Sequence, residues 1–139
     1  MSEISPSLHA EVVLRAGSRC EYCLLAQLGQ EATFHIDHVT PRAAGGPTTA
    51  DNLALACVSC SLRKGAKQTA TDPDTGDEVP LFNPRTQAWA EHFRWDGERV
   101  VPLTPTGRGT VIALSLNRPV IVAIRQEETA RRRHPSTPA

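Results

Sequence analysis

The four cysteines of the chain form two Cys-x-x-Cys pairs, Cys20/Cys23 and Cys57/Cys60. This spacing suits a tetrahedral zinc ion, because each pair supplies two neighbouring corners and the ion closes the intervening chain into a loop. A redox Cys-x-x-Cys motif would explain only one pair, and free buried thiols would leave the paired spacing unexplained. The sequence therefore predicts a structural zinc site with four thiolate ligands.

The composition is that of an ordinary folded protein. The chain has 139 residues and 40% hydrophobic content, enough for a compact fold with a modest core. Lys plus Arg equals Asp plus Glu at 15 each, so net charge alone does not indicate nucleic-acid binding. No segment approaches the roughly 20 apolar residues of a membrane span, and the first ten residues lack the apolar stretch of a signal peptide. We therefore expect a cytoplasmic protein without a membrane partner, whose reduced thiols are available to a metal.

Local patterns predict an α+β fold. Ser5 followed by a proline predicts the start of a helix over 5–16, and Gly17 predicts its end. Alternating apolar residues predict a strand over 33–39 that pairs antiparallel with a strand over 53–56, and a helix over 59–67 follows the second cysteine pair. Further predicted elements are a turn over 71–76, a short strand over 100–103, and helices over 84–92, 109–116 and 119–130, the last capped by Asn117.

We expect the chain to be organised in three parts. Residues 1–70 form the metal-tied core with its N-terminal helix, residues 71–133 form a mostly helical extension packed on that core, and residues 134–139 form a disordered tail. Trp89, Phe93 and Trp95 are gathered in one stretch of a chain that is poor in aromatic residues. We expect them to anchor the C-terminal half by packing rather than to stack on bases.

Four short motifs between Cys20 and Gly65 resemble the HNH endonuclease family. These motifs are Cys20-Glu21-Tyr22-Cys23, His35-Ile36-Asp37-His38, Asp51-Asn52-Leu53, and Cys57-Val58-Ser59-Cys60 with Lys64-Gly65. The resemblance implies a treble-clef-like ββα-metal fold, in which a hairpin and a helix hold one divalent cation and the four cysteines hold zinc. It also implies a nuclease that hydrolyses phosphodiester bonds.

The resemblance implies a role for three residues of these motifs. His38 would be the general base that activates water, Asp37 would bind the catalytic cation, and Asn52 would position the histidine or its loop. An imidazole that titrates near neutrality and a Lewis-acid metal suit this reaction, and an oxygen-rich site would suit Mg²⁺ or Mn²⁺. A structural role for His38 and a turn role for Asn52 are the alternatives.

One position departs from the family pattern. The family usually has His or Asn after the last cysteine, as a ligand of the catalytic metal, whereas this chain has Ser61. A neutral hydroxyl is a poorer ligand than an imidazole or an amide carbonyl. His35 lies two residues before Asp37, so both project from the same face of a strand, and we consider His35 a compensating ligand of the same ion. By the same parity His38 points away from Asp37 unless the strand ends or bulges there.

Four basic residues flank the motifs and are candidates for phosphate contacts: Arg42, Arg63, Lys64 and Lys67. The alternative for each is an exposed charge on a solvated face. We expect nucleic acid as the partner, with double-stranded DNA as the substrate. Two other functions stay compatible with the sequence: a catalytically weak or inactive nucleic-acid-binding module, and a zinc-stabilised protein-interaction module.

Overall fold

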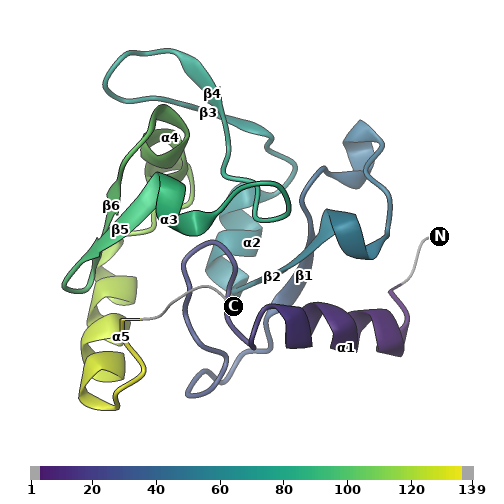
Figure 1. The fold of residues 1–139 in the computed structure, drawn as a ribbon, viewed down its shortest axis with the longest axis horizontal. Helices are drawn as coiled ribbons and strands as arrows, with labels where there is room; N and C mark the ends of the chain where they lie inside the picture. The colour runs from purple at the N-terminus through teal and green to yellow at the C-terminus, as the bar shows by residue number, and fades with distance from the viewer. Residues whose placement is uncertain (1–3, 136–139) are drawn as a thin grey trace.

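A two-stranded antiparallel hairpin followed by a helix lies at the centre of the protein (Figure 1). The computed structural model describes residues 4–135, and in it β1 (His35–His38) pairs with β2 (Leu53–Ala56). The register places His35 opposite Ala56 and His38 opposite Leu53. Helix α2 (Val58–Lys64) begins directly after β2. This order of strand, loop, strand and helix confirms the predicted α+β arrangement.

Helix α1 (Pro6–Arg15) begins and ends close to the predicted positions. Ser5 is its N-cap, and the Ser5 hydroxyl accepts a hydrogen bond from the backbone N–H of Leu8 at 3.2 Å. At the other end of the helix, the Arg15 guanidinium donates to the backbone carbonyls of Ala50 and Leu53 at 2.7 and 2.6 Å. These bonds fasten α1 to the start of β2.

The remaining elements lie in the loop of the hairpin and in the C-terminal half. The loop contains the 3-10 turns η1 (Arg42–Ala44) and η2 (Ala50–Asn52). The C-terminal half contains β3 (Thr69–Thr71), β4 (Glu78–Pro80), α3 (Trp89–His92), β5 (Phe93–Asp96), β6 (Arg99–Pro102), α4 (Pro105–Ala113) and α5 (Pro119–Ala130). β3 and β4 form one antiparallel hairpin, at the top of Figure 1, and β5 and β6 form another.

Several predictions for the C-terminal half were wrong in their bounds or their kind. The helix predicted over 84–92 is confined to Trp89–His92, because the Asn83 side chain accepts from the backbone N–H of Arg85 and closes a turn instead. The helix predicted over 109–116 begins at Pro105, with Thr104 as its N-cap. The β3–β4 hairpin surrounds the predicted turn and, like β5, was not foreseen.

Helix α5 has the predicted bounds, but Asn117 does not cap it. The N-cap position is Arg118, which makes no side-chain capping bond. The Asn117 side chain instead accepts from the Val100 N–H at 2.7 Å and donates to the Val100 carbonyl at 2.8 Å. Asn117 therefore joins the start of α5 to strand β6.

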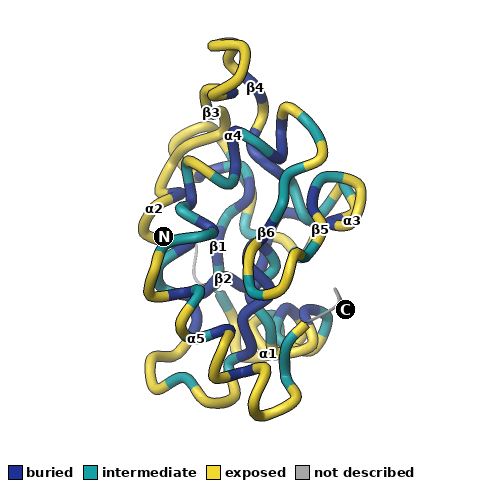
Figure 2. The backbone as a smooth tube through the Cα atoms, turned by 90° about the vertical axis from the view of Figure 1, so that its left-hand side faces the viewer, coloured by how far each residue is buried: buried dark blue, intermediate teal, exposed yellow. Residues whose placement is uncertain are grey.

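Buried apolar residues of both halves form one continuous cluster. All four residues of β2 are buried, and this strand is dark blue in Figure 2. Trp89 and Phe93 are buried as predicted, whereas Trp95 is partly exposed. The indole N–H of Trp89 donates to the Tyr22 carbonyl at 2.9 Å, so the C-terminal half contacts the segment between the first two cysteines.

The last described residues lie beside the β5–β6 hairpin. His134, the first residue of the predicted tail, lies with a ring nitrogen 2.7 Å from the Gly97 carbonyl and packs edge-on against the Trp95 ring. Residues 136–139 of that prediction lie outside the described residues. Among residues 4–135, no helix combines the length and apolarity that a membrane span requires.

Candidate functional site

The four cysteines converge in the interior. Their sulfur atoms all lie within 4.8 Å of one another, and all four side chains are buried. The Sγ atoms of Cys23 and Cys57 are 3.7 Å apart. Four sulfurs at the usual Zn–S distance of about 2.3 Å, arranged as a tetrahedron, would be separated by about 3.8 Å. The cluster therefore has the size of a four-thiolate zinc site.

The backbone prepares each cysteine pair in the same way. The N–H of Cys23 donates to the Cys20 sulfur at 3.5 Å, and the N–H of Cys60 donates to the Cys57 sulfur at 3.4 Å. Cys57 is also the N-cap of α2, so the helix begins at the metal cluster. Leu24 follows the first pair with a φ of 62°, which turns the chain back so that the Cys20 N–H reaches the Leu25 carbonyl.

The buried thiols are poorly suited to carry charge without a cation. Burial raises the pKa of the Cys20 thiol, whereas hydrogen bonds from the neighbouring thiols lower the pKa of Cys57. A divalent cation would favour the ionised form of all four sulfurs, because metal ligation requires the thiolate.

Asp37 lies on the inner face of β1 and has two partners from distant parts of the chain. Its side chain is 7% exposed, and it accepts a hydrogen bond from the Tyr22 hydroxyl at 2.7 Å. The Lys64 ammonium lies 3.3 Å from the same carboxylate, and this lysine is 2% exposed. Burial raises the pKa of Asp37, while Lys64 and Tyr22 oppose that rise.

His38 points to the opposite side of β1, towards the loop. Its Nε2 atom lies 2.9 Å from the Thr48 hydroxyl and accepts from the Arg42 Nε–H at 3.2 Å. Burial and the charge of Arg42 lower the pKa of His38 from its ordinary value of 6.5. The imidazole is therefore neutral at physiological pH, with an unprotonated Nε2.

Asn52 fastens the loop that carries the partners of His38. Its side-chain carbonyl accepts from the Thr40 N–H at 2.9 Å, and its amide donates to the carbonyls of Thr40 and Pro47 at 3.1 and 2.8 Å. Gly46 lies against the same carbonyl of Thr40, where a Cβ atom would be 1.8 Å from the oxygen. The loop therefore closes only with glycine at this position.

Replacing Asn52 by alanine should destabilise the protein by about 1–3 kcal/mol, because one backbone N–H and two carbonyls would lose their buried partner. Urea unfolding of the zinc-loaded protein measures this change. Asp51→Ala is the matched control, since Asp51 is exposed and its side chain bonds only to Thr49 among the contacts that the structure gives. Equal stability of the two variants would contradict the role of Asn52 in fastening the loop.

His35 and Ser61, both considered as ligands of a second cation, contact each other. The His35 Nδ1 atom is 2.9 Å from the Ser61 hydroxyl, at the surface. Asp37 is occupied by Tyr22 and Lys64 instead. Within residues 4–135, the four cysteines form the one group of three or more His, Cys, Asp or Glu side chains placed to share an ion.

A surface hollow of about 360 Å³ brings four of the predicted site residues together; its walls include Asp37, His38, Arg42 and Ser61. Arg63 and Lys67 are exposed on and just after α2, joined by a bond from the Lys67 ammonium to the Arg63 carbonyl. Lys64 was predicted with them as a phosphate contact, but its ammonium is buried against Asp37. It does not belong to the exposed basic surface of this structure.

The comparison with protein families agrees with this geometry. A sequence model of the HNH endonuclease family matches residues 20–67, from the first cysteine to just beyond α2. These residues are an HNH domain. The matched segment is about a third of the chain and contains every residue considered above for the metal and nuclease sites. Searches of curated proteins and of solved structures found no match.

Two residues that contact the predicted site residues Asp37 and His38 were not predicted from the sequence. Tyr22, the only tyrosine of the chain, lies between the first two cysteines, which was its one available signal. Thr48 lies in a loop and is followed by Thr49 and Ala50. Nothing in this sequence pattern indicates that Thr48 contacts His38. Both contacts join residues at least ten positions apart and depend on the folded loop.

Proposed function

We propose that the HNH domain binds zinc at its four cysteines and is an endonuclease that hydrolyses phosphodiester bonds of double-stranded DNA. The observation that carries the proposal is the placement of the His38 imidazole at the wall of a hollow that also contains Asp37 and Arg42, where burial and the charge of Arg42 lower the pKa of His38. A general base must be unprotonated before it can accept a proton from water.

The partners of His38 suggest how the base is controlled. Arg42 donates to His38 Nε2 and is also exposed at the hollow, where it can reach a phosphate oxygen. Nε2 has a single lone pair, and the Thr48 hydroxyl lies against the same atom. A phosphodiester that attracts the Arg42 guanidinium and the Thr48 hydroxyl would release this lone pair, which would then accept the proton of the attacking water. Asn52 would keep the loop in place.

The donor chemistry at the hollow suits a hard divalent cation, though with few ligands. Asp37 and Ser61 offer oxygen atoms, which Mg²⁺ and Mn²⁺ prefer, and His35 lies beside Ser61. Such an ion would supply Lewis-acid stabilisation of the charge that develops on the phosphate. Lys64 competes for the same carboxylate. We therefore expect the second cation to bind much more weakly than zinc.

The nucleic acid would lie over the hollow and the exposed face of α2. Arg42, Arg63 and Lys67 supply positive charge there, although the chain as a whole has no net charge. Phosphate neutralisation releases counterions, so binding should weaken steeply as salt is added. A zinc-stabilised protein-interaction module would not retain DNA in this salt-dependent way.

A plasmid-nicking assay tests the proposed activity. The zinc-loaded protein is incubated with supercoiled plasmid, with and without added Mg²⁺ or Mn²⁺. Omission of the second metal is preferable to a chelator, because a chelator would also remove zinc and unfold the domain. We expect nicking only with the added metal. If the protein retains the plasmid but does not nick it even with added Mg²⁺ or Mn²⁺, the catalytic part of the proposal is contradicted.

The lowered pKa of His38 predicts the pH dependence of cleavage. A base acts only when neutral, so kcat/KM should rise as the pH is raised through the pKa of His38, which is lowered from 6.5, and should level off above it. A bound divalent cation would lower this pKa further and leave the prediction unchanged. Initial nicking rates between pH 5 and 8 provide the measurement, and a half-maximal rate above pH 7 would contradict it.

One observation favours a second candidate, a nucleic-acid-binding module of the same fold with little or no turnover. The Asp37 carboxylate is already neutralised by the buried Lys64 ammonium, and Ser61 stands where the family usually has a stronger ligand. Salt-dependent retention of DNA together with an absence of metal-dependent nicking would support this candidate. Nicking that depends on His38 would exclude it.

A further inference from the structure

We infer that Arg125 is the buried charge partner of the four-thiolate zinc site, an inference that rests on the zinc binding proposed above. Arg125 lies on α5, in the C-terminal half and outside residues 20–67. Its side chain is 2% exposed. The inference assigns to it a role in metal affinity that the family match does not contain.

The hydrogen bonds of Arg125 leave much of its guanidinium without a partner. Nη1 donates to the Glu98 carbonyl at 3.0 Å, and the guanidinium lies 5.0 Å from the centre of the Trp95 ring. The Nε and Nη2 atoms are buried and make no hydrogen bond. A buried cation with so few contacts is costly, unless a negative charge nearby offsets the loss of water.

No carboxylate of residues 4–135 supplies that negative charge through an ion pair. Across residues 4–135, the ion pairs do not include Arg125. Glu128 lies one turn further along α5, but its carboxylate is bound by Arg133 at 2.6 Å. The charge that stabilises Arg125 must therefore come from another kind of group.

One cysteine of the cluster shares a small hollow with Arg125. Cys23 and Arg125 are walls of the same hollow, which Glu128 and Arg133 also line. Burial lowers the pKa of Arg125, and the thiols of Cys23, Cys60 and Cys20 oppose that change through their charge. Once ionised by a metal, three of the four zinc ligands would therefore act electrostatically on this one guanidinium.

Zinc would strengthen this interaction. A divalent ion with four thiolates carries an excess of two negative charges, because each of the four sulfurs is ionised. In the protein interior this excess interacts strongly with a nearby cation, since the effective dielectric constant is well below that of water. Arg125 would offset part of the excess charge, and α5 would in turn be held against the HNH domain by the metal.

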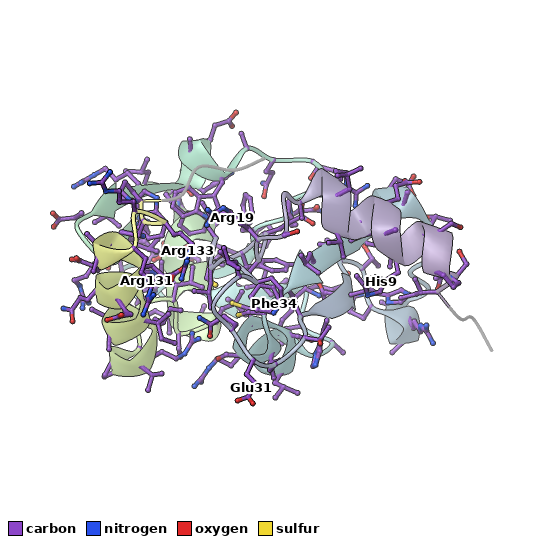
Figure 3. All side chains as sticks on the ribbon, turned by 90° about the horizontal axis from the view of Figure 1, so that it is seen from below. His9, Arg19, Glu31, Phe34, Arg131 and Arg133 are labelled. Carbon is purple, nitrogen blue, oxygen red and sulfur yellow. The ribbon has the colours of Figure 1, made fainter. Side chains whose placement is uncertain are left out.

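The test compares zinc affinity and cobalt spectra of full-length variants. Arg125→Met removes the charge while keeping an unbranched side chain, and Arg125→Lys keeps the charge. Two controls lie on or beside the same helix: Arg131→Met removes an exposed charge, and Ile121→Val changes the packing of a buried side chain without changing charge. Arg131 is labelled in Figure 3 at the end of α5. Competition with a chromogenic chelator gives zinc affinity, and Co²⁺ substitution gives the energy of the thiolate-to-metal charge-transfer band.

We expect Arg125→Met to lower zinc affinity about tenfold or more, as for other residues that support metal ligands indirectly. Its cobalt charge-transfer band should move to lower energy, because the thiolate electrons lose a stabilising positive charge. Arg125→Lys should keep most of the affinity, and Ile121→Val should leave the band in place even if it lowers stability. The band position separates a charge effect from a packing effect.

Unchanged zinc affinity and an unchanged cobalt band in Arg125→Met would overturn the inference. If that variant does not fold, Arg125→Lys decides: affinity within about threefold of the wild type supports the inference, and a loss of tenfold or more overturns it. Failure of the underlying zinc proposal is recognised separately. A wild-type protein that binds neither zinc nor Co²⁺ refutes the metal site itself, whatever the variants do.

Discussion

Cys60→Ser should leave the protein unable to retain zinc and largely unfolded at room temperature. Cys60 is 0% exposed, and its sulfur lies within 4.8 Å of the three other thiols. Structural zinc contributes roughly 10–16 kcal/mol of apparent binding free energy in small zinc-dependent units. That is as large as the whole stability of a typical domain, about 5–15 kcal/mol, so loss of the ion should exceed what the remaining core supplies.

The structure gives a reason to expect that this unfolding reaches beyond the zinc ligands. The cysteines belong to the same buried cluster as Trp89, Phe93 and Ile121 of the C-terminal half. Far-UV circular dichroism and zinc content by elemental analysis provide the measurements for Cys60→Ser. Ser59→Ala is the matched control, because Ser59 is the neighbour of Cys60 on α2 and, within residues 4–135, its hydroxyl bonds only to Arg63 at the surface.

Chelation of the wild-type protein should have the same effect as Cys60→Ser, and addition of zinc should reverse it. A circular-dichroism spectrum that resists the chelator, in a protein that contains no zinc, would contradict the metal dependence of the fold. The same result for Ser59→Ala and Cys60→Ser would show that the change acts through α2 rather than through the metal.

The features that could be predicted from the sequence are those encoded by short-range patterns. The cysteine spacing predicted the thiol cluster, and alternation of apolar residues predicted the pairing of β1 with β2. The helices α1 and α5 were predicted closely because each begins at a proline with ordinary helical residues behind it. In each case the deciding residues lie within one element or one motif.

The features that were missed depend on contacts between distant segments. Lys64 reads as a surface cation at the end of α2, and only the folded chain places it against Asp37 and Tyr22. Arg125 has no signal of its own within an amphipathic helix. The turn at Asn83 and the helix predicted there share the same Asn-Pro start, and a side-chain bond to Arg85 decides between them. The position of the site could thus be predicted from the sequence, whereas its electrostatics depend on tertiary contacts.

His38→Ala should lower the rate of metal-dependent nicking by a factor of about 10² to 10⁴, the usual contribution of a general base. The fold should survive, because the side chain is partly exposed and its contacts are confined to Thr48 and Arg42 among those that the structure gives. Unchanged zinc content and an unchanged circular-dichroism spectrum would establish that the loss is chemical rather than structural.

His9→Ala is the matched control for this variant. His9 lies on α1, exposed, as Figure 3 shows, and outside the matched residues 20–67. It should nick plasmid at the wild-type rate. Both variants should also retain plasmid with the same salt dependence as the wild type, because the phosphate contacts proposed for Arg42, Arg63 and Lys67 are intact in each.

The comparison of the two histidine variants separates three explanations of any observed cleavage. If His38→Ala alone loses activity while it still retains DNA, the imidazole acts in the chemical step. If the wild type and His38→Ala nick equally, the activity belongs to a contaminating nuclease or to a group other than His38, and the proposed mechanism is wrong. If neither the wild type nor His38→Ala nicks plasmid but both retain DNA, the ion pair of Lys64 with Asp37 has replaced the catalytic cation, and the protein acts as a binding module.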